Sequence, residues 1–284
     1  MEMNILINNM FASPDEIYAP TEGDYVGKDG LWYCGKCNTP MQARINVLGE
    51  ERTQYVPCRC RQDEIEAAEE QQRRYAKEMH LMYARERCFP DGVLWKWNFD
   101  NCDDITDPLM VTAKKYCENF DELYRKSCGL VLYGPVGVGK SFAAACMANE
   151  LIEKDRSVHM TDFSRIINTL WGHTDGKQKY LDSLIDYDLL IIDDLASQRN
   201  TPYAMEIVMN VIDSRYRSGK PLIVTTNLAA EDLFKPSGLS EQRVYSRICE
   251  MCIPVPCNGK DRRKAKMKKN VAEYGEKLFV GKDK

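Results

Sequence analysis

The residues with the most specific chemistry form a glycine-rich run that directly follows an apolar stretch. Positions 134–141 have the sequence Gly-Pro-Val-Gly-Val-Gly-Lys-Ser, after the apolar residues 129–133. This spacing is that of a phosphate-binding loop, in which glycines let successive N–H groups point at an anion. Lys140 is expected to reach the β- and γ-phosphates of ATP, and the Ser141 hydroxyl to bind Mg²⁺. The predicted nucleotide-binding residues of this loop are Gly134, Pro135, Val136, Gly137, Val138, Gly139, Lys140, Ser141 and Phe142.

Two adjacent carboxylates lie at the end of a second apolar run. Residues 187–195 have the sequence Tyr-Asp-Leu-Leu-Ile-Ile-Asp-Asp-Leu, which predicts a buried strand that ends beside the phosphate loop. We expect Asp193 to hold the Mg²⁺ shell and Asp194 to orient or deprotonate the attacking water. Two solvated acids at a strand end are the alternative, but their position after a phosphate loop favours the nucleotide site.

A third apolar run ends in polar residues that belong at the same edge of the sheet. Residues 221–227, Pro-Leu-Ile-Val-Thr-Thr-Asn, predict a strand, and ligands bind at the carboxyl ends of strands in open α/β sheets. Asn227 is therefore expected to contact the γ-phosphate or the attacking water, with Thr226 as a lesser candidate. A cap for the next turn is the alternative role for this asparagine.

Two arginines lie four residues apart in a helical pattern over 240–249. This spacing places Arg243 and Arg247 on one face of the helix. An arginine presented by a neighbouring subunit stabilises charge on a transferring phosphoryl group. Pairing with Glu241 or Glu250 on the helix surface is the alternative, and the spacing by itself favours that alternative.

Four cysteines in two close pairs predict a zinc site near the N-terminus. Cys34 and Cys37 form C-x₂-C, and Cys58 and Cys60 form C-x-C, with two strand-like segments at 41–50 and 52–56 between the pairs. A unit of about 30 residues has too little core without a metal or disulfide. A redox pair and four unrelated thiols are the alternatives, and Cys88 is a spare candidate ligand. The remaining cysteines are expected in the core, namely Cys102, Cys117, Cys128, Cys146, Cys249, Cys252 and Cys257.

The composition sets the class of protein that must position these residues. The 284 residues are 44% hydrophobic and 29% charged, which is ordinary for a soluble globular protein. The sequence contains no run of 18 apolar residues, and its first 30 residues carry six acids and one lysine, unlike a secretory signal. We therefore expect a cytoplasmic protein whose cysteines stay reduced.

The pattern along the chain divides it into five segments. The predicted divisions are a weakly structured N-terminus (1–30), a zinc-binding unit (31–60), a charged helical connector (61–87), an ATPase domain (88–259) and a basic tail (260–284). In the ATPase domain strands alternate with helices, which predicts an α/β fold with a parallel sheet. Strands are expected at 130–133, 157–161, 188–193, 221–225 and 252–255, and helices near 108–126, 140–153, 163–171, 203–218 and 240–249.

Two segments have the composition of a nucleic-acid contact. Residues 260–269 contain seven Lys or Arg and one Asp, so a phosphate contact and a solvated tail are about equally supported. Residues 165–179 combine Trp171 with several cations, which suits base stacking together with backbone contact. The alternative for that segment is a covering helix in which the tryptophan is packed.

Taken together, these motifs resemble those of the AAA+ ATPases and, within them, the replicative helicase loaders of the DnaC/DnaI type, which share their core with the transposition helper IstB. The resemblance covers roughly residues 88–265. It depends on the segments LVLYGPVGVGKSF, YDLLIIDDLA, PLIVTTN and RVYSRI, the last followed by Cys-Ile-Pro-Val.

The resemblance implies roles that spacing alone does not give. Asn227 is similar to sensor I, Arg247 to the arginine finger with Arg243 as its companion, and Arg262 to a sensor II residue. Asp194 replaces the glutamate of many AAA+ proteins, so slow hydrolysis is expected. The implied partners are a DnaB-type hexameric helicase held through the N-terminal zinc unit, single-stranded DNA at the ATPase domain, and further copies of the chain. A transposition helper and a non-hydrolysing, ATP-switched adaptor remain the alternatives.

Overall fold

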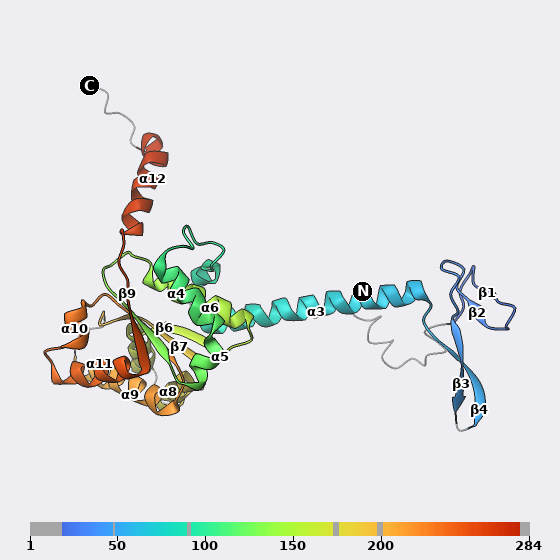
Figure 1. Ribbon diagram of the computed structural model, residues 1–284, viewed down its shortest axis with the longest axis horizontal. Coiled ribbons are helices and arrows are strands. Elements are labelled where there is room, and N and C mark those ends of the chain that lie inside the picture. Colours follow the sequence, from blue (N-terminus) through green and yellow to red (C-terminus); the bar gives the residue numbers. More distant parts are fainter. Residues whose placement is uncertain (1–18, 48, 90–91, 173–175, 198–200, 279–284) are drawn as a thin grey trace. The chain divides into compact units, whose positions relative to one another are not determined.

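The structure is a computed structural model, and it describes residues 19–47, 49–89, 92–172, 176–197 and 201–278. The chain divides into two compact units, Met1–Met79 and His80–Lys284 (Figure 1). Much of the N-terminal segment predicted to be weakly structured lies outside the described residues. None of the described helices is both long and apolar enough to cross a membrane.

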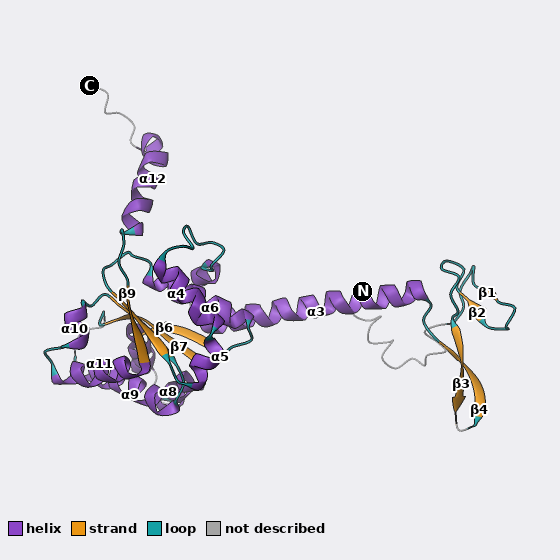
Figure 2. Cartoon of the chain, viewed as in Figure 1, coloured by secondary structure: helices purple, strands orange, loops and turns teal. Residues whose placement is uncertain are grey.

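The first unit consists of two short antiparallel sheets. Strand β1 (Tyr25–Val26) pairs with β2 (Trp32–Tyr33), and β3 (Gln42–Val47) pairs with β4 (Glu50–Tyr55) in a hairpin (Figure 2). The hairpin agrees with the two strands expected between the cysteine pairs. Its core is very small, because the fully buried apolar residues that cluster here are Cys34, Met41 and Cys58. This unit therefore depends on its cysteines for packing.

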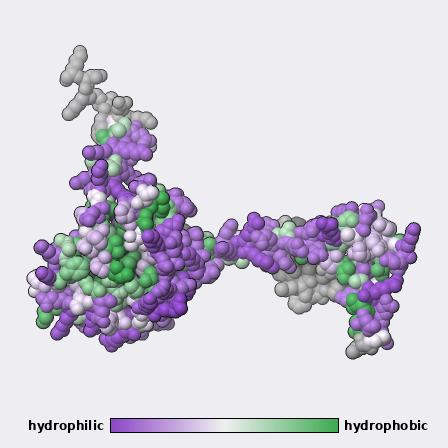
Figure 3. All heavy atoms as spheres, in the orientation of Figure 1, coloured by the Kyte–Doolittle hydropathy of each residue, from purple (hydrophilic) through white to green (hydrophobic). Residues whose placement is uncertain are grey.

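Helix α3 (Arg59–Cys88) begins in the first unit and ends in the second. Its surface is mainly hydrophilic (Figure 3), and of its residues Cys88 is the buried one. Pairs four residues apart, such as Glu70 and Arg74 at 2.9 Å, support the exposed helix. This is the charged helix expected over 61–87. Cys88 packs in the core of the second unit, where burial raises the pKa of its thiol, so it is not a fifth ligand of the cysteine cluster.

The second unit is built on a five-stranded sheet with the order β6-β7-β8-β5-β9. All four neighbouring pairs are parallel, which confirms the predicted α/β fold (Figure 1). The strands are β5 (Gly129–Tyr133), β6 (Val158–Asp162), β7 (Leu189–Leu195), β8 (Leu222–Thr226) and β9 (Cys252–Pro256).

Alternating side chains of these strands enter two separate cores, as expected for a sheet that is covered on both faces. Leu130 and Leu132 pack with α4 (Pro108–Glu118) and α6 (Lys140–Glu153), whereas Val131 packs on the opposite face. The helices contributing to that second core are α7 (Phe163–Gly172), α8 (Lys177–Asp186), α9 (Pro202–Ser218), α10 (Ala230–Phe234) and α11 (Leu239–Met251).

The structure contains helices that the sequence pattern did not predict. Helices α8 and α10 were not expected, and the helix expected near 108–126 divides at Asn119 into α4 and α5 (Phe120–Arg125). A short 3₁₀ helix, η1, covers Gly92–Lys96. Residues 262–278, predicted as a basic tail, form helix α12 (Arg262–Leu278). Its start is stabilised by Asp261, whose carboxylate accepts hydrogen bonds from the N–H groups of Arg263 and Lys264.

The other cysteines are divided between the interior and its margin. Cys117, Cys146, Cys252 and Cys257 are buried, as expected of core residues, and Cys102, Cys128 and Cys249 are half-buried. Burial raises the pKa values of Cys146 to about 12 and Cys257 to about 11. These thiols are therefore protonated at neutral pH and behave as small apolar side chains.

Candidate nucleotide site and cysteine cluster

The phosphate loop connects β5 to α6 in a backbone conformation that requires glycine. Gly134, Gly137 and Gly139 have φ values of +132°, +84° and +103°. A Cβ atom at Gly134 would lie 2.4 Å from the carbonyl oxygen of Cys257, which cannot move away easily because it is backbone. Gly139 directly precedes α6, so the loop ends at a helix N-terminus, where the partial positive charge favours an anion.

Lys140 is held inside this loop by three acceptors. Its Nζ donates hydrogen bonds of 2.8 Å to the carbonyl oxygens of Gly134 and Pro135 and to Oδ1 of Asn227. The residue is only 6% exposed, and burial lowers its pKa, while the charges of Asp194 and Asp193 oppose that shift. An ammonium has three donors, so a phosphate must replace one of these acceptors when it binds.

The carboxylates at the end of β7 are fixed by the neighbouring strand β8. The Thr225 hydroxyl donates to Oδ1 of Asp193 at 2.5 Å and accepts from the N–H of Asp194 at 2.9 Å. Asn227 donates from Nδ2 to Oδ1 of Asp194 at 2.7 Å. The structure therefore brings Lys140, Asn227 and Asp194 into one continuous hydrogen-bonded chain at the carboxyl edge of the sheet.

Thr225 was missed by the sequence analysis, which considered Thr226 instead. The Thr226 side chain is fully buried and donates to the carbonyl oxygen of Leu195. Side chains alternate along a strand, so Thr225 lies on the same side as Asn227 and Thr226 on the other. This alternation was the signal that could have identified Thr225.

Arg262 also lies against the loop, although it is far from it in sequence. Its backbone N–H donates to the carbonyl oxygen of Gly137 at 2.9 Å, and its Nη2 pairs with Oδ2 of Asp107 at 2.7 Å. Asp107 is a second residue that the sequence analysis missed. Its local signal, an acid directly before Pro108 at a helix start, indicates only a helix cap.

The two arginines of α11 are placed differently from each other. Arg247 forms an ion pair with Asp213 of α9 and lies over the ring of Tyr216, with its Cζ 5.7 Å from the ring centroid. Arg243 is exposed. Arg247 thus contacts α9 of its own chain. To act on a nucleotide bound by a neighbouring copy, its guanidinium would have to leave Asp213 and bind a phosphate.

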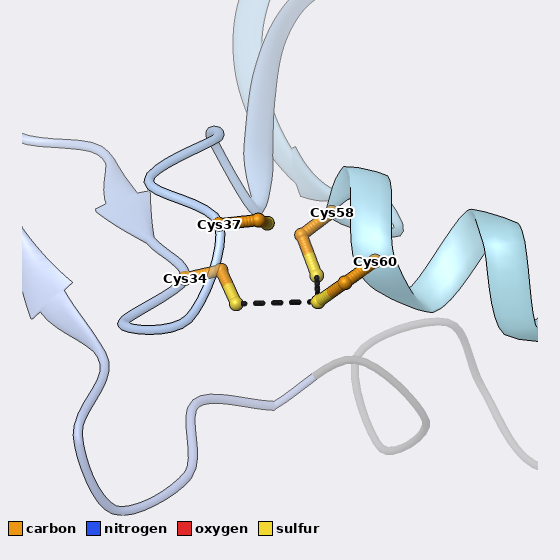
Figure 4. Close-up of side chains that lie close together, drawn as sticks. All are labelled: Cys34, Cys37, Cys58 and Cys60. Atoms are coloured by element: carbon orange, nitrogen blue, oxygen red, sulfur yellow. Dashed lines mark hydrogen bonds between the residues drawn. The ribbon is translucent and has the colours of Figure 1, made fainter.

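The four cysteines of the first unit come together in one cluster. Their sulfur atoms all lie within 4.8 Å of one another, with Cys34 and Cys60 at 3.7 Å and Cys58 and Cys60 at 3.4 Å (Figure 4). In tetrahedral coordination with Zn–S bonds of about 2.3 Å, sulfurs are about 3.8 Å apart, so the donor set fits zinc. A hydrogen bond with Thr39 lowers the pKa of Cys37 to about 5, whereas hydrogen bonds with Cys58 and Cys37 raise the pKa of Cys60 to about 12, so the fit to zinc rests on the positions of the four sulfur atoms.

The comparisons with known proteins agree with the nucleotide-binding geometry of the second unit. Residues 64–270, more than half of the chain, match the family of IstB-like ATP binding proteins. The chain belongs to this family. Its resemblance to the helicase loaders is also confirmed: it is 29% identical over 177 residues to the replicative helicase loader DnaI of Bacillus subtilis, covering 56% of each sequence. To the replicative helicase loader DnaC of Escherichia coli it is 29% identical over 140 residues, covering 48% of this chain and 55% of DnaC.

These relatives match the chain over part of their length only. The chain spans about half the length of the two loaders. It is also 31% identical over 111 residues to a putative ATP-binding protein in an insertion sequence of Mycobacterium tuberculosis, covering 37% of this chain and 43% of that protein. The crystal structures of DnaI and of the DnaC helicase loader each superpose with a TM-score of 0.51, at 22% and 23% identity. The superposition with DnaI covers 61% of this chain and 94% of the DnaI chain, and that with DnaC covers 59% of this chain and 100% of the DnaC chain. This likeness shows a shared fold.

In this IstB-like chain the predicted DNA-contact segment carries an exposed aromatic residue. Trp171 at the end of α7 is 73% exposed and forms a T-shaped ring contact with Tyr203 on α9, with ring centroids 6.1 Å apart. The alternative for this segment was a covering helix with a packed tryptophan; the covering helix is present as α7, whereas Trp171 is exposed. Residues 173–175 of the segment lie outside the described residues, and Lys177 and Lys179 belong to α8.

Proposed function

We propose that this IstB-like protein is a magnesium-dependent ATPase that loads a hexameric replicative helicase of the DnaB type onto single-stranded DNA. The observation that carries the proposal is the hydrogen-bonded chain from Lys140 through Asn227 to Asp194. It joins the phosphate loop to an acidic strand end, which is the arrangement that ATP hydrolysis needs.

Each group in the site has a defined task in this proposal. Lys140 and the loop N–H groups hold the phosphates, and Ser141 with Asp193 holds Mg²⁺, which neutralises phosphate charge. Asp194 and Asn227 orient the attacking water. The Asp194 carboxylate is also held by Asn227 at 2.7 Å, so its direction is fixed before any substrate arrives. Arg247, with Arg243 beside it, would act on the nucleotide of a neighbouring copy.

The cysteine cluster and the exposed tryptophan supply the partner contacts in this proposal. The first unit, with zinc bound by Cys34, Cys37, Cys58 and Cys60, would bind the helicase. Trp171 with nearby lysines would bind single-stranded DNA by stacking and charge. The longer matches to DnaI and DnaC favour a helicase as partner, whereas the shorter match to an insertion-sequence protein supports a transposition helper as the second candidate.

The Asp194→Asn variant tests the proposal, because it keeps the hydrogen-bonding shape and removes the charge. We expect ATP to bind with little change and the turnover rate to fall by about 10²–10⁴-fold, the range for loss of a general base. Phosphate release measures turnover. Displacement of a strand annealed to single-stranded circles by a DnaB-type helicase measures loading, and we expect this loading to fail in the variant. The Asp182→Asn variant makes the same chemical change at an exposed carboxylate on α8 and should behave as the unchanged protein.

The outcomes separate the proposal from its alternatives. Normal turnover in Asp194→Asn contradicts the role of this carboxylate in hydrolysis. Loss of turnover with loading intact identifies an ATP-switched adaptor instead of an energy-using loader. Stimulation of turnover by a transposase with duplex DNA, and not by a helicase, identifies a transposition helper.

A further inference from the structure

The first turn of α12 is attached directly to the phosphate loop. The N–H of Arg262 donates to the carbonyl oxygen of Gly137 at 2.9 Å. A Cβ atom on Gly137 would lie 2.2 Å from Oδ1 of Asp261, so this carboxylate is in close contact with the loop backbone. The same Asp261 oxygen accepts from the N–H groups of Arg263 and Lys264. The loop and the start of α12 are therefore one connected piece of structure.

The Arg262 guanidinium is bound by a carboxylate and has its flat face against the loop. Its Nη2 donates to Asp107, and its Nε, Cδ and Cζ lie at nearly equal distances, 3.5–3.7 Å, from the position that a Cβ atom on Gly139 would occupy, so the flat face at Nε covers Gly139. Gly139 directly precedes α6, at the helix N-terminus of the nucleotide site. A guanidinium presents five N–H donors in a rigid plane, so it can bind a carboxylate through one edge and a phosphate through another.

Asp107 is itself held in place by a second hydrogen bond. Its Oδ1 accepts from the N–H of Leu109 at 2.9 Å and so caps α4, while its Oδ2 accepts from Arg262. The Asp107 side chain is 24% exposed and that of Arg262 is 32% exposed, so water screens the ion pair only in part. One carboxylate thus connects a fixed helix end to the guanidinium that lies beside the loop.

We propose that Asp107 is a positioning residue for nucleotide binding. By holding Nη2, it fixes the plane of the Arg262 guanidinium beside the phosphate loop, so that the N–H donors not used by Asp107 are available to a nucleotide phosphate. This inference rests on the proposed function, since it assumes that the loop binds ATP. It goes beyond that function by assigning a role to the residue that caps α4, which lies outside every nucleotide-binding motif of the chain.

The Asp107→Asn variant tests the inference, because asparagine caps a helix as well as aspartate does but cannot form the ion pair. We expect the dissociation constant of a fluorescent ATP analogue, measured on the full chain with Mg²⁺, to rise about tenfold, as when one charge-assisted hydrogen bond to an anion is misdirected. The matched control is Asp103→Asn, which changes an exposed aspartate near the start of the same helix and should leave binding unchanged.

A double-mutant cycle separates positioning from helix capping. Arg262→Lys should also weaken binding, and adding Asp107→Asn to it should weaken binding little further, because there is no guanidinium plane left to orient. The inference is overturned if Asp107→Asn lowers the affinity for the ATP analogue equally in the unchanged protein and in Arg262→Lys, or lowers it in neither. Tighter binding in Asp107→Asn would also overturn it. Lys140→Ala should abolish binding in the same assay, and normal binding there contradicts the proposed function itself.

Discussion

Removal of the zinc ion that we propose for the cysteine cluster is expected to unfold the two small sheets of the first unit and to leave the nucleotide unit folded. The physical reason is the size of the core. Its three buried residues are Cys34, Met41 and Cys58, and of the three partly buried residues packed on them, Cys37 and Cys60 are again candidate ligands. With so little apolar area, the free energy of folding of this unit would come mainly from the proposed zinc ion, and a structural zinc site contributes about 10–16 kcal/mol.

Metal analysis and hydrogen exchange measure this effect on the intact protein. We expect one zinc ion per chain, lost in Cys58→Ser or on treatment with a strong chelator. Amide exchange in β3 and β4 should then become as fast as in an unfolded peptide, while exchange in β5, β7 and β8 should not change. Cys249→Ser, a half-buried cysteine of α11, is the matched control and should retain the metal. Slow exchange in β3 and β4 after complete metal removal would contradict a structural role.

The parts of the site that could be predicted are those in which the residues of a short motif determine the backbone conformation of that same segment. The loop ending at Lys140 and the strand ending at Asp193 and Asp194 each combine a residue type with a local geometry, so the sequence alone located them. Thr225 was within reach of the same reasoning, because strand alternation pairs it with Asn227. Its neighbour Thr226, which the motif also contains, instead points into the core and binds the carbonyl oxygen of Leu195.

The remaining parts depend on contacts between distant segments. The ion pair between Arg262 and Asp107 joins residues 155 positions apart, and no local pattern indicates that spacing. Residues 260–269 have the composition of a solvated tail, yet α12 begins there because Asp261 caps it and Gly137 accepts its first N–H. Arginine in the last turn of a helix usually remains exposed, so nothing in the sequence of α9 predicts that Arg215 is buried.

Replacement of Arg215 by methionine is expected to lower the free energy of unfolding of the second unit by about 3–5 kcal/mol. Arg215 is 1% exposed and makes five hydrogen bonds, all to backbone carbonyl oxygens. The acceptors belong to the end of α8 and to the starts of β7 and β8, namely Ile185, Tyr187, Asp188 and Pro221. Methionine fills a similar length but donates nothing, so four carbonyl groups would remain buried without this donor.

We attribute the loss of unfolding free energy in Arg215→Met to the lost hydrogen-bond donors. Two further variants, Arg217→Met and Arg215→Lys, separate this loss from the effect of removing a positive charge. Burial lowers the pKa of Arg215 to about 10, so the guanidinium stays charged at neutral pH and is balanced by carbonyl dipoles, including those at the C-terminal end of α8. Arg217→Met removes a 77% exposed arginine on the same helix, whose carboxylate partner is 3.7 Å away, and should cost about 0–1 kcal/mol.

Lysine at position 215 keeps the charge but has three donors on a single atom, so it cannot reach acceptors on three segments at once. Urea unfolding followed by far-UV circular dichroism should therefore rank the unchanged protein first, Arg215→Lys second and Arg215→Met last. If Arg215→Lys matches the unchanged protein, charge alone accounts for the stabilisation. If Arg215→Met matches Arg217→Met, the five hydrogen bonds contribute no net stability, and the junction of α8, β7 and β8 is held by apolar packing instead.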